Sequence, residues 1–289
     1  MVFMTQDGAS PIGAATHRIA ERSTLGRLRF GTYLAPNVLP VYEAVTEEVG
    51  RRLGIETELT VETSYESCER DENEVCFVCS MPYVTLERRG LDLAIPVAAP
   101  VLEGERYRGR PIYYSDVIVH RDSPFESFLD LRGRSWAYNE PLSHSGYGLT
   151  RYHLVRLGET NGFFGEVVEA GFHQEAIQMV VRKEIDGSAI DSQVLAIELR
   201  DKPDLAERVR VVEALGPSTI QPVAVSRRVP EDLRAAITEV LLTMAEDPSV
   251  RRRLGTGLVG RFVSVDARSY DDIRKMVDAC EAAGFLELR

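Results

Sequence analysis

Segments with a strand pattern and segments with a helix pattern alternate along the first hundred residues. Residues 28–33 are typical of a short strand, and the apolar side chains of residues 38–53 recur at helical spacing until Gly54 ends that pattern. Residues 55–61 alternate as a strand, whereas residues 75–78 and 91–98 are apolar runs typical of buried strands. This alternation predicts an α/β fold with mostly parallel sheets.

Length and charge limit the classes of protein that the chain can belong to. With 289 residues, of which 44% are hydrophobic, it can bury one large core or two lobes of roughly 100 to 150 residues each. The net charge is −11 and no long run of Lys or Arg occurs. A protein that binds phosphate backbones or anionic membranes needs a basic face, so we expect neither nucleic acid nor membrane insertion.

A hydroxyl-rich turn, Ser143-His144-Ser145-Gly146, lies between a predicted strand at residues 135–138 and a predicted helix at residues 149–157. The first backbone N–H groups of a helix are unpaired and carry partial positive charge, so hydroxyls and glycine there can form a seat for an anion. The alternative is purely structural: Ser145 caps the helix and Gly146 permits the tight turn.

A second segment strengthens the first interpretation. His173 begins a His-x-x-Ala-Ile helix, and an Ala-x-Asp-Ser strand end follows at residues 189–192. Together with the Ser-x-Ser-Gly turn, the strand at residues 113–123 and the Asp-Leu-x-Gly approach at residues 130–133, this order resembles the phosphonate, phosphite and phosphate substrate-binding proteins of ABC importers. The ordered matches run from about Phe30 to Asp191.

This resemblance implies a two-lobed type II periplasmic-binding-protein-like fold, each lobe a mostly parallel sheet flanked by helices, with a two-strand hinge. Residues 28–114 and 226–289 would form lobe 1, and residues 115–225 would form lobe 2. Residues 1–27 lack a sustained apolar run, which predicts an N-terminal extension of disordered type. The implied function is to close a cleft around a small anionic ligand, a phosphonate, phosphite or phosphate, with no cofactor. The protein would serve an ABC importer, with its permease as partner, or an intracellular sensing role.

The resemblance also places the ligand-binding residues. From lobe 2, Ser143, Ser145 and Gly146 would grip anionic oxygens, with His144 and His173 beside them and Asp191 as an acceptor. Each has a plainer alternative: His173 can be a satisfied loop histidine, and Asp191 can be the N-cap of a helix at residues 193–199.

Lobe 1 would contribute tyrosines and a hydroxyl. Tyr65 matches a tyrosine that closes over the ligand, and Tyr114 or its neighbour Tyr113 lies at the crossing between lobes. Val78 stands where the family often has an aromatic donor, so Ser80 or Tyr83 would replace it. An isolated tyrosine is usually a half-buried packing residue.

Three features leave the ligand's identity open. His144 replaces the small hydroxyl residue that the family usually has between the two serines, and an imidazole with a pKa near 6.5 would make affinity rise as the pH falls toward 6. The charged segment at residues 66–74 is unusual for the family's second helix. Cys76 and Cys79 have Cys-x-x-Cys spacing with Cys68 nearby; we expect buried structural thiols and no metal, with a metal or redox role as the alternative.

An enzyme on the same fold is the competing hypothesis. A cytoplasmic lyase or synthase of a cofactor pathway would use His144 or His173 as general base beside Asp191. No nucleophile elbow, nucleotide-type phosphate loop or His-x-x-x-His pair occurs in the sequence, so we favour binding over catalysis and expect no catalytic residue.

The location follows from the first residues of the chain as given. Residues 1–27 contain neither the apolar core of a secretory signal nor adjacent arginines, which predicts a cytoplasmic protein. If an export signal has been removed, the protein would be periplasmic or exposed on the cell surface.

Overall fold

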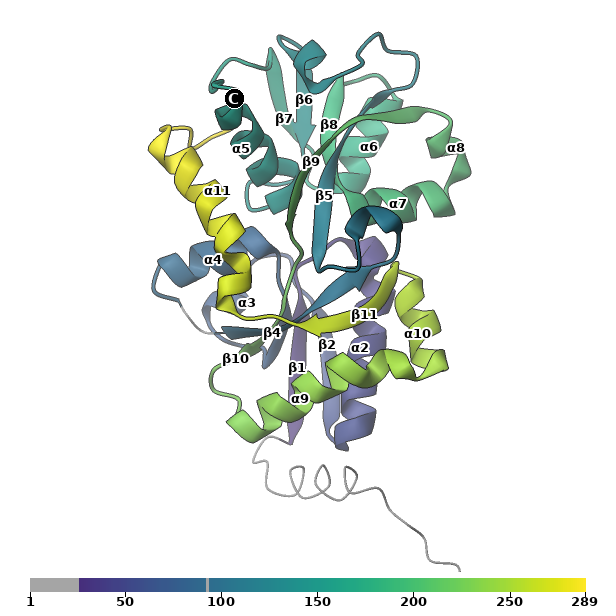
Figure 1. Ribbon diagram of the computed structural model, residues 1–289, viewed down its shortest axis with the longest axis vertical. Coiled ribbons are helices and arrows are strands. Elements are labelled where there is room, and N and C mark those ends of the chain that lie inside the picture. The colour runs from purple at the N-terminus through teal and green to yellow at the C-terminus, as the bar shows by residue number, and fades with distance from the viewer. Residues whose placement is uncertain (1–25, 92–93) are drawn as a thin grey trace, which may run out of the picture.

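The computed structural model describes residues 26–91 and 94–289, and it contains two β-sheets flanked by helices (Figure 1). The predicted N-terminal extension therefore lies outside the described residues, except that Arg27 already belongs to the first strand. No helix in these two ranges is long and apolar enough to cross a membrane.

The first sheet has the strand order β11-β4-β10-β3-β1-β2. Its strands are β1 (Arg27–Thr32), β2 (Glu56–Val61), β3 (Val75–Phe77), β4 (Ala94–Leu102), β10 (Val223–Ser226) and β11 (Val259–Ser264). The accompanying helices are α2 (Leu39–Leu53), α3 (Glu66–Glu69), α4 (Ser80–Arg88), α9 (Glu231–Thr243) and α10 (Pro248–Gly255).

The second sheet has the order β7-β6-β8-β5-β9. Its strands are β5 (Ile112–His120), β6 (Ser135–Tyr138), β7 (Glu166–Glu169), β8 (Gly187–Asp191) and β9 (Val209–Thr219). Helices α5 (Leu149–Arg156), α6 (His173–Val181), α7 (Ser192–Asp201) and α8 (Pro203–Ala206) surround it.

Periodicity predicted the elements at the start of the chain well. The helical spacing of residues 38–53 corresponds to α2, whose side chains Val41, Val45 and Val49 are buried against the first sheet. The helix ends at Gly54, which adopts a left-handed φ of 66° and donates its N–H to the Gly50 carbonyl. The sequence patterns at residues 28–33 and 55–61 correspond to β1 and β2, so these local predictions are confirmed.

Both sheets are mixed, which refines the prediction of mostly parallel sheets. β1 runs parallel to β2 and β3, and β6 runs parallel to β7 and β8, whereas β10 and β5 run antiparallel to their neighbours. Parallel neighbours need a crossover connection, usually a helix. The chain enters β5 and β10 from the other sheet. These two strands therefore need no crossover helix within their own sheet and can run antiparallel to their neighbours.

The chain changes sheets twice, between Leu102 and Ile112 and again between Thr219 and Val223. The helix α11 (Asp271–Ala282) then packs against both α4 and α5, so it contacts helices of both sheets (Figure 1).

The last residues lie beside the second sheet, although the sequence-based division assigns them to lobe 1. Phe285 and Leu288 are buried in the apolar cluster that contains Trp136 and Leu149. The Leu288 N–H also donates to the Tyr147 hydroxyl at 3.1 Å. Burial of these two apolar side chains explains the difference, because amphipathic periodicity does not say against which sheet a terminal segment packs.

Candidate functional site

The hydroxyl-rich turn forms a buried π-helical turn, η4 (His144–Gly148), that leads directly into α5. The Ser143 hydroxyl caps it by accepting the Gly146 N–H at 3.2 Å. The Gly148 N–H reaches the Ser143 carbonyl at 3.0 Å, five residues back. Residues 143–146 of this wide turn are all buried.

Four neighbouring segments hold the turn in place. The hydroxyl of Ser145 and Nε2 of His173 are hydrogen-bonded at 3.0 Å, and the Ser145 carbonyl accepts the Ser115 hydroxyl at 2.8 Å. Nε2 of His144 is bonded to the Ser218 hydroxyl at 2.7 Å, and the His144 N–H donates to Sγ of Cys79 at 3.4 Å. Since Cys79 precedes α4 of the first sheet, the turn is bonded to both halves of the molecule.

Six buried polar atoms around this turn have no hydrogen-bond partner among the described residues. Four belong to the second sheet's half of the molecule, namely His144 Nδ1, His173 Nδ1, Asn139 Oδ1 and the Tyr113 hydroxyl, and the hydroxyls of Tyr65 and Ser80 belong to the first sheet's half. More than nine in ten buried polar groups in proteins are paired, so a group of unpaired ones needs an explanation.

Several of the unpaired atoms lie close to the turn, and the Tyr113 hydroxyl lies by the Ser80 hydroxyl without reaching hydrogen-bond geometry. If a side chain were added at Gly146, its Cβ atom would lie 2.1 Å from Asn139 Oδ1, which is too close for two unbonded atoms. A Cβ atom added at Gly148 would lie 3.0 Å from His144 Nδ1. Glycine is therefore required at both positions for these polar atoms to approach the backbone. The rings of Tyr113 and His144 have centroids 6.3 Å apart, and the Tyr65 hydroxyl lies by the Cys79 backbone without reaching hydrogen-bond geometry.

Burial keeps the site's titratable side chains uncharged. It lowers the pKa of His144 and of His173 to about 3, because a charged imidazole would lose its hydration. His144 is therefore neutral near pH 6 in the unliganded protein, and a rise in affinity toward pH 6 requires that the bound anion raise the pKa of His144. Burial also raises the pKa of the Tyr65 and Tyr113 hydroxyls well above 10, so both remain hydrogen-bond donors.

Asp191 has both carboxylate oxygens engaged by the protein. Oδ1 caps α7 by accepting the backbone N–H groups of Gln193 at 2.8 Å and Val194 at 3.4 Å. Oδ2 accepts from the Gln221 side chain at 3.0 Å. These contacts are those of a helix N-cap, the plainer of the two roles expected for Asp191. Burial raises the pKa of Asp191 to about 6.

The tyrosines divide between the site and its surroundings. Tyr65 stacks on Tyr33 with centroids 4.8 Å apart and extends its hydroxyl to the site. Tyr83 packs edge-on against Tyr270 in the core of the first sheet, away from the turn. The ring of Tyr114 packs against the Arg106 guanidinium, whose Cζ lies 4.6 Å from the ring centroid. The neighbouring residue Tyr113 is buried and faces the turn. Adjacent residues of a strand point to opposite faces, so only one of this pair can reach the site.

Sequence reasoning missed Asn139, Cys79 and Ser218. Asn139 directly follows β6, and polar residues at the carboxyl end of a parallel strand are the expected positions for ligand contacts. That signal was present in the sequence. Nothing local identified Cys79 or Ser218, because their contacts with His144 arise only when the two sheets come together.

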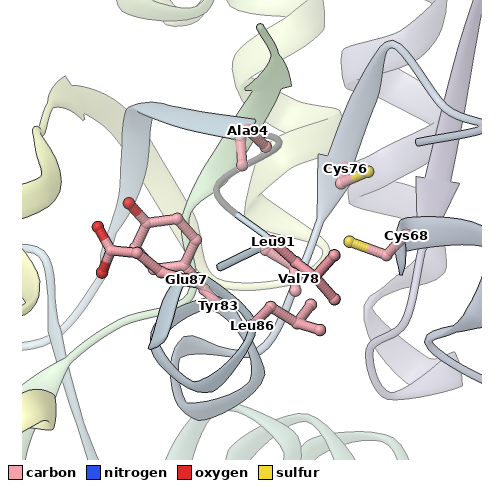
Figure 2. A pocket seen from close by; sticks show the side chains of 9 residues that line it. Cys68, Cys76, Val78, Tyr83, Leu86, Glu87, Leu91 and Ala94 are labelled. Atoms are coloured by element: carbon pink, nitrogen blue, oxygen red, sulfur yellow. The ribbon is translucent and has the colours of Figure 1, made fainter. Parts of the chain in front are cut away.

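The cysteines do not surround a common metal position. No group of three or more His, Cys, Asp or Glu side chains in residues 26–91 and 94–289 is arranged to hold a metal ion. Cys68 and Cys76 line an apolar cavity of about 20 Å³ in the first sheet (Figure 2), and Cys79 instead faces His144.

The comparison that decides the family covers most of the chain. Residues 32–270 match the family model described as "ABC transporter, phosphonate, periplasmic substrate-binding protein". The chain belongs to this family. This confirms the resemblance and favours substrate binding over the enzyme hypothesis, since the family is one of binding proteins. No curated protein sequence matches the chain.

Solved structures with low sequence identity share the fold. A binding-protein component of an ABC phosphonate transporter from Pseudomonas aeruginosa is 15% identical with a TM-score of 0.76, covering 88% of this chain and 86% of its own. PhnD1 from Prochlorococcus marinus, in complex with methylphosphonate, is 15% identical with a TM-score of 0.77, covering 89% and 99%. A Xanthomonas citri protein bound to ATP is 21% identical with a TM-score of 0.66, covering 89% and 98%. The type II periplasmic-binding-protein fold is confirmed.

Proposed function

We propose that this chain binds a small phosphorus oxyanion, a phosphonate, phosphite or phosphate, between its two sheets. The observation that carries the proposal is the group of six unpaired, buried polar atoms around η4. An anion with three or more acceptor oxygens would accept hydrogen bonds from the hydroxyls and imidazole N–H groups among them. The family match and the methylphosphonate bound to PhnD1 support this class of ligand.

The donors divide by type. Ser143 and Ser145 offer hydroxyls at the start of η4, and the Ser145 N–H belongs to its first turn, where partial positive charge favours an anion; the Gly146 N–H is already bonded to the Ser143 hydroxyl. Tyr113 offers a hydroxyl from β5 of the same sheet, and Tyr65 and Ser80 offer hydroxyls from the first sheet's half. Each neutral imidazole of His144 and His173 carries one N–H and one bare nitrogen, so one of them can accept from a protonated ligand oxygen. The roles predicted for Asp191, Tyr83 and Tyr114 receive no support from their contacts.

Lobe closure is part of the proposal. We assign residues 28–102 together with 223–283 to lobe 1 and residues 112–219 to lobe 2, with the C-terminal residues 284–289 packed on lobe 2; these bounds move the sequence-based boundaries at 114/115 and 225/226 to the starts of β5 and β10. Ligand donors come from both lobes, so bound ligand favours the closed arrangement by hinge bending at residues 103–111 and 220–222. Closure must also accommodate α11, which packs against α4 and α5.

The family's description supports a place and a partner. As a member of a periplasmic binding-protein family, the chain would act outside the cytoplasm and deliver its ligand to an ABC permease. This replaces the cytoplasmic location expected from residues 1–27, which lie almost entirely outside the described residues.

A binding screen with a defective variant tests the proposal. Native mass spectrometry of the freshly purified protein identifies any bound molecule, and thermal unfolding is then measured with methylphosphonate, phosphite, phosphate, sulfate, arginine and ATP. A true ligand at 100 times its dissociation constant adds about 2.7 kcal/mol of stability. We expect phosphonate, phosphite or phosphate to do so in wild type and far less in Ser145→Ala. Stabilisation by arginine or ATP alone, or equal stabilisation of the variant, would reject the proposed ligand or site.

A further inference from the structure

Cys68 and Cys76 face one small cavity on the side of the first sheet that carries α4. The cavity has a volume of about 20 Å³, roughly that of one water molecule, and its wall is almost entirely apolar (Figure 2). Cys68 belongs to α3 and Cys76 to β3, and Figure 2 shows their sulfur-bearing side chains next to each other. Neither side chain is used by the proposed ligand site.

The two thiols contact each other and differ in reactivity. The hydrogen bond from the Cys76 thiol lowers the pKa of Cys68, and the same contact, together with burial, raises the pKa of Cys76. Cys68 is also partly exposed, whereas Cys76 is 5% exposed. The thiolate is the nucleophile in disulfide exchange, so the reactive and accessible member of the pair is Cys68.

The other two cysteines are held elsewhere. Cys79 lies on the opposite side of the β3 segment, where its sulfur accepts the His144 N–H and burial raises its pKa to about 12. Cys280 is buried in α11. Among the four thiols, only Cys68 and Cys76 form a pair in contact.

We propose that Cys68 and Cys76 form a reversible disulfide bond. The Cys68 thiolate attacks one sulfur of a small disulfide such as oxidised glutathione and expels one glutathione thiolate. Cys76 then loses its proton and attacks Sγ of Cys68, which expels the second glutathione thiolate. The two protein thiols are oxidised while one glutathione disulfide is reduced to two thiols, and no other reactant is needed.

The bond would join two segments that lead to the site. Cys68 lies one turn after Tyr65, and Ser67 of the same helix is bonded to the Tyr33 hydroxyl at 2.7 Å. Cys76 lies on β3, which continues into Cys79 and Ser80. A link between α3 and β3 would therefore restrain Tyr65 relative to Ser80. This consequence for binding rests on the proposed function, whereas formation of the bond does not.

Peptide mapping tests the bond without any ligand. The protein is incubated with oxidised glutathione, its remaining thiols are alkylated, and it is digested under non-reducing conditions. Trypsin cleaves after Arg70, so a bond from Cys68 joins two peptides, whereas a bond between Cys76 and Cys79 stays within one. Cleavage after Phe77 then separates Cys76 from Cys79.

We expect wild type and Cys280→Ser to lose the mass of two hydrogen atoms, to yield the Cys68–Cys76 cross-linked peptide and to regain free thiols in dithiothreitol. Cys68→Ser should yield no cross-link. Complete alkylation of Cys68 and Cys76 after oxidation, or a cross-link through Cys79, would overturn the proposal.

Two further measurements test the effect of the bond. Because it constrains the unfolded chain, oxidation should raise the midpoint of thermal unfolding by about 5 °C. Methylphosphonate affinity should differ at least about threefold between the oxidised and reduced forms. A mapped bond with identical affinities in both forms would refute the coupling to the site, while absence of methylphosphonate binding in both forms would instead count against the proposed function.

Discussion

Two neighbouring strands of the second sheet end in helices whose first turns are completed in opposite ways. β6 leads into η4 and α5, and β8 leads into α7. Because β6 and β8 are adjacent and parallel, both helical segments begin at the same edge of the sheet. At α7, the Asp191 carboxylate fills the first turn and accepts three hydrogen bonds. At η4, none of the carboxylates in residues 26–91 and 94–289 is bonded to the turn, and His144, His173 and Asn139 keep unpaired atoms beside it.

This difference distinguishes a structural helix N-terminus from a candidate binding site. Both positions attract an anion for the same physical reason, since the first N–H groups of a helix are unpaired and carry partial positive charge. The chain supplies its own carboxylate at α7, whereas at η4 the neutral Ser143 hydroxyl caps the turn, and the anion is proposed to come from outside. The predictions below test that contrast, beginning with the largest effect.

Replacing Asp191 should damage stability more than binding. In Asp191→Ala, two backbone N–H groups and the Gln221 amide lose a buried acceptor, so we expect the free energy of unfolding to fall by about 3 kcal/mol. Ligand affinity should stay within about threefold of wild type. Chemical denaturation and calorimetric titration measure the two quantities.

Asp191→Asn is the matched control, because asparagine is also a good N-cap and should lose less stability. If Asp191→Ala instead abolished binding while unfolding remained unchanged, Asp191 would be a ligand residue, as the family resemblance implies, and the contrast between the two helix starts would be lost.

Ser145→Ala should show the reverse pattern. Removal of one charge-assisted hydrogen bond to a buried oxyanion costs about 2 kcal/mol, or roughly 30-fold in affinity, and loss of the bond to His173 should cost about 1 kcal/mol of stability. Ser188→Ala is the control, since its buried hydroxyl donates to the Ala137 carbonyl at 2.9 Å within the same sheet. It should lose about 1 kcal/mol of stability and no affinity. Equal affinity of Ser145→Ala and wild type would remove η4 from the site.

Tyr113 and Tyr114 offer a comparison of neighbours. In Tyr113→Phe, one donor that faces the turn is removed, so affinity should fall about fivefold, or about 1 kcal/mol. In Tyr114→Phe, the hydroxyl that donates to the Arg106 carbonyl at 3.4 Å is removed, and affinity should remain unchanged. Titration of both variants with the same phosphonate decides which face of β5 meets the ligand; a larger loss in Tyr114→Phe would reverse the assignment.

The sequence could predict what is local or periodic. The spacing of apolar residues located β1, α2 and β2, and the order of motifs identified the family and the turn at Ser143 to Gly146. Contacts between distant segments were beyond it. The pairing of Asp191 with Gln221, the inward face of Tyr113 and the packing of Phe285 beside the second sheet depend on how the two sheets come together.

The burial of His144 and His173 belongs to the same class. A histidine next to a hydroxyl-rich turn has the same sequence whether it is solvated or buried, and only burial decides whether its pKa remains near 6.5 or falls to about 3. The expected response of affinity to pH therefore depends on the pKa of these histidines in the liganded protein and stays a prediction.

The smallest expected effect is the opposite response of the two helix starts to acid. His144 has a pKa near 6.5 in the unfolded chain and about 3 in the folded protein. Below pH 6.5 the unfolded chain therefore binds a proton that the folded protein does not, and stability is lost as the pH falls. Asp191 has a folded pKa of about 6, above its usual 3.8, so the folded state binds its proton more tightly and acidification through pH 6 stabilises it. Between pH 7 and pH 6 we expect a net loss of stability in wild type, a loss about 0.5 kcal/mol smaller in His144→Gln, and a slightly larger loss in Asp191→Asn. Chemical denaturation gives the free energy of unfolding of each protein at pH 7 and at pH 6, and the difference between the two values is the slope. A change in stability that a substitution causes at both pH values does not affect this difference. A His144→Gln slope equal to that of wild type would mean that His144 is solvated in the folded protein, and η4 would then be an open surface turn instead of a buried anion seat.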